Sequence, residues 1–226
     1  MIHYPPSTIV DRPVPKAAFY RHLDLTPRLK QRFVDDVESI RWAAKLTSST
    51  LNVAEGKAVQ EIAVFEVTLK QEEVSDDVFV SIDKQMPRHT LFLLRHADRQ
   101  LLLINFKEAT NAERTDYKII KTFRTPWQSA DISTLSLTGN DMDGIYEYLV
   151  GQVSGFGTHT AADTKSILEL KNTIAQKEKQ YKTLQAKVKR EPQIRKQMEM
   201  FSELKALKTE INSMNETLNK LTDTNE

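Results

Sequence analysis

The sequence predicts an α+β fold in which a small sheet and three helices precede a C-terminal helical arm. Residues 61–69 are rich in β-branched side chains with a period of two, and apolar runs at residues 91–94 and 101–104 flank a polar linker. From residue 163 to 222, apolar residues recur at intervals of three and four. These patterns are typical of strands and of a coiled coil, respectively. We expect a mixed or antiparallel sheet of about four strands.

The N-terminal elements follow from proline and capping signals. Residues 1–18 contain four prolines and are expected to form an extended leader. Thr26 and Pro27 predict a helix start, with Thr26 as the N-cap and Pro27 in the first turn. Apolar residues continue at helical spacing as far as Ala44, so we expect this helix to end near Leu46.

The rest of the globular part, which we place at residues 19–157, alternates strands and helices. Residues 91–94 and 101–104 are apolar on both faces, which predicts central strands of a hairpin. The expected elements are an extended piece at 51–53, strands at 61–69, 91–94, 101–104 and 117–124, and helices at 75–86 and 140–153. Glycines between residues 151 and 157 predict a domain boundary before the arm.

The arm, at residues 163–222, contains two apolar runs of similar length separated by Pro192. A straight helix would be about 85 Å long and would need a partner to cover its stripe. Extending the heptad frame of the first run would place Arg195 and Ser202 in the core, and a proline inside a helix costs about 3 kcal/mol. We therefore favour an antiparallel helical hairpin whose distal end is closed by Ile194, Met198 and Phe201.

Charge is unevenly distributed along the chain. The net charge is +1 overall, but residues 164–226 hold 13 Lys or Arg against 9 Asp or Glu. A basic tip suits phosphate backbones, although a solvated coil surface would look the same. The candidate nucleic-acid-binding residues are Lys182, Lys187, Lys189, Arg190, Arg195 and Lys196.

Several classes of site are not indicated by the sequence. There are no cysteines, the five histidines lack zinc spacing, and neither a nucleophile elbow nor a phosphate-binding glycine loop is present. No apolar run approaches the ~18 residues of a membrane span, and residues 1–6 do not resemble a signal peptide. We expect a cytoplasmic protein with no metal, no cofactor and no membrane partner.

The sharpest enzymatic hypothesis is a metal-dependent nuclease of the PD-(D/E)xK type. Such enzymes place carboxylates and an acid-x-Lys pair on neighbouring strands, where the carboxylates bind Mg²⁺. Asp116 and Lys118 have that spacing, Glu66 is a separate candidate acid, and the sequence places no second acid beside either. Lys70 shares a strand face with Glu66, but the two are four residues apart.

An ordered set of short segments supports a family resemblance. They are Phe19-Tyr20, Leu29-Lys30, Phe33-Val34, Trp42, the run from Glu61 to Glu66, Ile82-Asp83-Lys84, Leu91-Phe92, Trp127, Ile145-Tyr146 and the tail from Lys189 to Ile194. In this set the chain resembles the bacterial domain-of-unknown-function family 4391, from about Lys16 to Leu221. The resemblance implies no catalytic residues. It implies that such genes often stand beside helicase and DNA methyltransferase genes.

Three functional hypotheses follow. The first is a non-enzymatic accessory subunit of a DNA-directed defence or restriction-modification-like system, docking a helicase or DNA methyltransferase and contacting DNA through the arm. The second is the nuclease. The third is a structural module that forms a homodimer through the arm.

Overall fold

The computed structural model describes residues 4–22, 24–111, 117–131, 135–157 and 159–222, with the side chain of His22 outside that description. The chain divides into two compact units, Met1–Thr158 and His159–Glu226. We call them the sheet unit and the hairpin unit.

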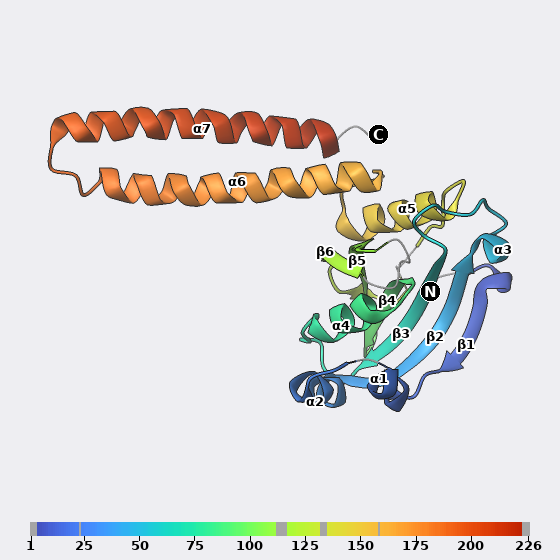
Figure 1. Ribbon diagram of the computed structural model, residues 1–226. Coiled ribbons are helices and arrows are strands. Elements are labelled where there is room, and N and C mark those ends of the chain that lie inside the picture. The colour runs from blue at the N-terminus through green and yellow to red at the C-terminus, as the bar shows by residue number, and fades with distance from the viewer. Residues whose placement is uncertain (1–3, 23, 112–116, 132–134, 158, 223–226) are drawn as a thin grey trace. The chain divides into compact units, whose positions relative to one another are not determined.

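The sheet unit contains a seven-stranded mixed sheet within the described residues, with the order β1-β2-β3-β4-β5-β6 and β7 paired with β5 (Figure 1). The strands are β1 (Ile9–Pro13), β2 (Val37–Thr47), β3 (Glu61–Leu69), β4 (His89–His96), β5 (Arg99–Ala109), β6 (Tyr117–Arg124) and β7 (Gln128–Ser129). The α+β class and the mixed sheet are confirmed. The expected count of four strands is too low, because β1, β2 and β7 were not anticipated.

Helices in this unit are also more numerous than the three expected. The described ones are the 3₁₀ turn η1 (Pro6–Thr8) and the α-helices α1 (Lys16–His22), α2 (Pro27–Asp36), α3 (Ser48–Leu51), α4 (Asp77–Gln85) and α5 (Met142–Ser154). Thr26 caps α2 as predicted, accepting a hydrogen bond from the Leu29 amide. Asp141 caps α5 in the same way, through the Gly144 amide.

The prediction that the first helix runs to Leu46 is wrong. α2 ends at Asp36, and residues 37–47 form β2, which is antiparallel to β3. The register with β3 shifts between Val37 and Ser39 and again between Trp42 and Ala44. Each bulge inserts one extra residue into the strand. The buried positions of β2 therefore depart from a period of two and imitate helical spacing.

Two further expectations need correction. Residues 9–13 lie in the segment expected to be a leader, yet they form β1, which pairs antiparallel with β2 at the sheet edge. An edge strand tolerates Pro13, which cannot donate to a ladder. Residues 51–53 are not an extended piece, because α3 reaches Leu51 and Asn52 adopts a left-handed conformation with φ 54°.

The central strands and the helices packed on them, α5 among them, form the core. β4 and β5 make the predicted hairpin, and residues 89–94 and 100–107 are buried without alternation, so both faces of the sheet are covered. On one face, Phe19 of α1, Phe33 of α2 and Phe79 of α4 belong to the same cluster as Phe65 and Phe92 of the sheet. These three helices therefore form a layer that packs on one face of the sheet (Figure 1).

The hairpin unit consists of α6 (Ala161–Val188) and α7 (Ile194–Thr222), which run antiparallel (Figure 1). A capping box between Thr160 and Asp163 begins α6. Lys177 Nζ and Glu210 Oε2 pair across the two helices at 2.6 Å. The apolar residues predicted to pack between the two helices, which we call the seam, form the least exposed face of each helix. Buried residues of the seam include Ile174, Val188, Leu204 and Ile211. Supercoiling of the two helices stays a prediction.

Candidate functional site

The distal end of the hairpin unit brings together residues from both helices. Residues 189–193 connect α6 to α7, and Gln197 Nε2 donates a hydrogen bond of 3.2 Å to the Val188 carbonyl. The same carbonyl, at the end of α6, also accepts from the Glu191 amide at 3.4 Å, so Gln197 adds a second donor there. The first turn of α7 therefore lies beside the last turn of α6.

The six candidate nucleic-acid-binding residues all lie at this end, and we call them the basic tip. Lys182 and Lys187 lie in the last two turns of α6, and Lys189 and Arg190 follow directly. Arg195 and Lys196 are in the first turn of α7. All six are exposed. Among the described ion pairs, only Arg195 of the six takes part, at 3.4 Å from Glu199 with 93% of its own side chain exposed.

An apolar stripe on α7 contradicts the expectation that it closes the distal end. Ile194, Met198 and Phe201 are 72%, 69% and 56% exposed. The end is closed instead by Val188, which is buried, and by Gln197. Because the three residues are spaced i, i+4 and i+7, they lie on one face of α7. We call this face the apolar stripe.

The nuclease candidates are not gathered into one place. Glu66 lies on β3 and pairs with Arg95 at 3.2 Å, while Lys118 lies on β6 opposite Glu108. β4 and β5 separate these strands, which puts about 14 Å between them across the sheet at normal strand spacing. Glu66 is also level with Leu102 of β5, six residues along that strand from Glu108, so the two positions are about 25 Å apart. Asp116 lies outside the described residues. Among the residues that are described, no group of three or more His, Asp or Glu side chains could hold a metal ion.

Asp83 of α4 and Lys107 of β5 form a buried ion pair that was not predicted from the sequence. Lys107 Nζ lies 2.7 Å from Asp83 Oδ1, and both side chains have 0% exposure. Burial raises the pKa of Asp83 and lowers the pKa of Lys107, while the charge of each partner opposes the shift. No sequence signal marks the pair, because a lone Lys among apolar strand residues has no recognisable spacing to its partner.

Lys107 also holds the segment between α4 and β4 in place. Its ammonium donates to the backbone carbonyls of Asp83 at 2.7 Å, Met86 at 3.2 Å and Arg88 at 2.7 Å. It lies 4.3 Å from the ring centroid of Tyr117. Carbonyls at a helix C-terminus lack intrahelical partners, so a buried ammonium is a strong substitute.

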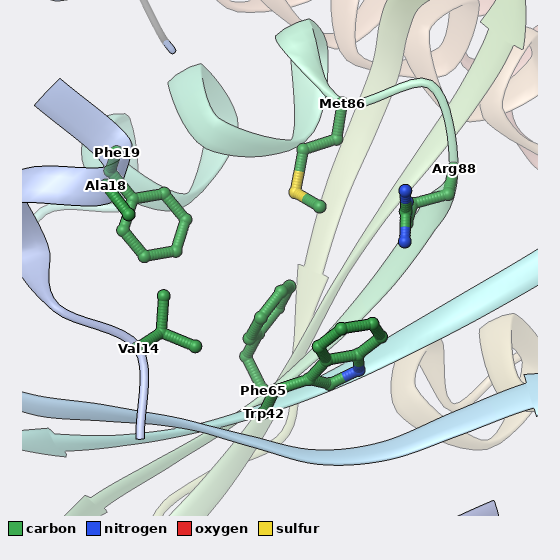
Figure 2. A pocket seen from close by; sticks show the side chains of 7 residues that line it. All are labelled: Val14, Ala18, Phe19, Trp42, Phe65, Met86 and Arg88. Carbon is green, nitrogen blue, oxygen red and sulfur yellow. The ribbon is translucent and has the colours of Figure 1, made fainter. Parts of the chain in front are cut away.

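That segment forms one wall of a cavity of about 250 Å³, which we call the aromatic pocket. The pocket is lined by Val14, Ala18, Phe19, Trp42, Phe65, Met86 and Arg88. Figure 2 shows the apolar side chains around an open space, with Arg88 on the same side as Trp42. This pocket was not predicted from the sequence, because the helix expected to run to Leu46 included Trp42, which instead lies on β2 beside Phe65.

Comparison with known proteins identifies the family. A model described as Domain of unknown function (DUF4391) matches residues 2–211. The chain belongs to the DUF4391 family. The resemblance stated above is therefore confirmed. No curated protein and no solved structure matches this DUF4391 chain.

The DUF4391 match includes every feature described in this section. It spans the sheet unit with the aromatic pocket, the whole of the basic tip, and the apolar stripe, and it ends within α7. Over the parts of this DUF4391 chain that the structure describes, no helix has both the length and the apolar composition for a transmembrane segment.

Proposed function

We propose that this DUF4391 protein is a non-enzymatic accessory subunit of a DNA-directed defence or restriction-modification-like system. In this proposal the basic tip binds the phosphate backbone of DNA, and the apolar stripe binds a helicase or DNA methyltransferase subunit. The observation that carries the proposal is the exposure of all six cations at one end of a helical hairpin.

The geometry of the basic tip suits a sequence-independent contact. Lys and Arg contact backbone phosphates through charge and charge-assisted hydrogen bonds that do not depend on the bases, and all six side chains are exposed to solvent. Pro192 and the short connection hold two basic segments of the sequence at the same end. A surface of this kind increases the affinity for DNA but does not recognise the base sequence.

The apolar stripe suits a protein partner. Ile194, Met198 and Phe201 are large apolar side chains whose exposure on a soluble surface favours association. Their i, i+4 and i+7 spacing is that of a helix that lies in an apolar groove of another protein. The nature of that partner comes from the family resemblance, which implies helicases and DNA methyltransferases.

A salt titration tests the DNA contact. We expect binding of the full chain to a short fluorescent duplex, measured by anisotropy, to weaken steeply with salt, with a slope of about 0.9 per phosphate contacted. Changing the six tip residues to Gln removes these contacts. The matched control changes six exposed basic residues of the sheet unit to Gln: Arg21, Arg28, Lys30, Lys57, Lys84 and Lys121.

The two variants carry the same loss of charge, so net charge cannot explain a difference between them. We expect the tip variant to lose most of the affinity and of the salt slope, and the control to keep most of both. If the tip variant and its control bind with the same affinity and slope, DNA contact by the basic tip is excluded.

A further inference from the structure

The aromatic pocket is a preformed cavity with fixed walls. The Phe65 ring lies 6.1 Å from Phe19 and 6.4 Å from Trp42, measured between centroids. Phe65 also stacks on Phe92 at 6.0 Å, and Trp42 Nε1 donates to the Ala44 carbonyl at 2.9 Å. These contacts hold the rings, so a ligand would not pay to organise them.

One cation lies at the edge of this apolar space. The Arg88 guanidinium is 6.0 Å from the Trp42 ring centroid, and its Nη1 donates to Glu61 Oε1 at 2.6 Å. Lys45 Nζ lies 3.3 Å from the other oxygen of Glu61. Two cations thus share one carboxylate, which leaves a net positive charge. A guanidinium has five N–H donors, so Arg88 can keep Glu61 and bind a second anion.

We propose that the aromatic pocket binds a small organic acid that has an apolar body and one carboxylate. An apolar cavity of about 150 Å³ accepts benzene. The larger volume of about 250 Å³ therefore accommodates a ring with a short side chain, or a short alkyl chain. The carboxylate binds Arg88 at the edge, while the apolar body lies against Phe19, Trp42 and Phe65. The site is independent of the basic tip and of its proposed function.

Tryptophan fluorescence provides a direct test. The chain has two tryptophans, so Trp127→Phe leaves Trp42, a wall of the pocket, as the reporter. Octanoate and phenylacetate are the probes, and octanol and 2-phenylethanol are their uncharged counterparts. We expect a saturable change in Trp42 emission, with each acid binding about tenfold more tightly than its alcohol.

Two variants in the same background separate the roles of charge and space. Arg88→Met should abolish the preference for acid over alcohol, and Ala18→Phe should fill the pocket and abolish both signals. Arg28→Met, at an exposed position of α2, should change neither. Methyl NMR of methionine-labelled protein gives a second readout, because the Met86 signal should shift with the acid.

Three results would overturn the proposal. One is the absence of a saturable response to either acid in the folded Trp127→Phe protein. Another is equal affinity for acid and alcohol, which would mean that Arg88 does not recognise the anion. The third is an unchanged response in folded Ala18→Phe protein, which would place the ligand elsewhere. The comparison of acid with alcohol requires no variant at the pocket.

Discussion

Lys107 Nζ lies 2.7 Å from Asp83 Oδ1, and neither side chain has any exposed surface. The same ammonium binds the carbonyls of Met86 and Arg88, two residues that line the aromatic pocket. A buried charge on a central strand thereby fixes the loop that forms one wall of the candidate ligand site.

Lys107→Met should destabilise the protein severely. It leaves the Asp83 carboxyl buried without its partner and removes a donor from three backbone carbonyls, so we expect a loss of about 3–5 kcal/mol in the free energy of unfolding. The double variant Lys107→Met with Asp83→Leu should lose less than the single one, because no buried charge remains. Urea denaturation measures both. A loss below about 1 kcal/mol in the single variant would show that the pair is not buried as described.

The buried phenol of Tyr4 should make the stability of the folded state fall at alkaline pH. Burial raises the pKa of Tyr4, and it raises the pKa of Tyr146 in the same way. The folded state therefore favours the protonated phenol. This contribution is fully present below the unfolded pKa of about 10, and it is lost as the pH rises above that value, at about 1.4 kcal/mol per pH unit for each tyrosine.

The Tyr4→Phe variant removes the contribution of Tyr4 to this pH dependence and leaves that of Tyr146. The Tyr4 hydroxyl is buried and has no hydrogen-bond partner among the described residues, so its removal should not destabilise the protein at pH 7. Between pH 10 and 11 the variant should lose stability less steeply than the unmodified protein. Denaturant unfolding across this range is the measurement, and identical slopes would exclude a raised Tyr4 pKa.

Two isoleucines of the hairpin unit make a matched pair. Ile174 is 6% exposed on the seam, and Ile194 is 72% exposed on the apolar stripe. Ile174→Ala should cost about 2–4 kcal/mol locally, whereas Ile194→Ala should change stability by no more than about 0.5 kcal/mol. Amide hydrogen exchange in α6 and α7 reports each cost. Equal effects would mean that the apolar stripe is covered within the folded chain.

Two glycines near α5 give a second matched pair. A Cβ on Gly56 would lie 2.3 Å from the Val59 carbonyl oxygen and 2.5 Å from Asp143 Oδ1, whereas a Cβ on Gly144 would meet nothing closer than 3.4 Å. The Asp143 carboxylate accepts hydrogen bonds from the amides of residues 57–59.

Gly56→Ala must displace the Asp143 carboxylate, so we expect it to lower the melting temperature, at a cost of about 1–3 kcal/mol. Gly144→Ala should be neutral or stabilising by up to about 1 kcal/mol, because alanine favours a helix. Thermal unfolding followed by circular dichroism compares them. A Gly56→Ala variant as stable as Gly144→Ala would contradict the close approach of Asp143.

Local pattern was sufficient for some elements and misleading for others. The strand at 61–69 follows from alternation, the β4–β5 hairpin from two apolar runs around a polar linker, and the start of α5 from the cap at Asp141. These signals act over a few residues. β2 was misread because its two bulges depend on the pairing with β3, which no local signal reveals. The pairing of β1 at the edge is equally nonlocal.

The candidate sites divide in the same way. The six basic residues were proposed from charge and from the proline break, because both are properties of neighbouring residues, and their role stays a prediction. The exposure of Ile194, Met198 and Phe201 was not, since it depends on how Gln197 and Val188 close the distal end. The aromatic pocket is lined by residues from four separate segments of the chain. These segments come together only through the order of the strands in the sheet and the packing of helices on it.

The sequence alone determined the α+β class, the central strands and the charge of the distal helices, because hydrophobic periodicity and composition are local. Only the tertiary structure decided that Lys107 reaches Asp83, that Trp42 faces Phe65 and that Glu66 and Lys118 stay apart. Each of these depends on strand order and register, and burial free energy selects those only once the whole sheet is assembled.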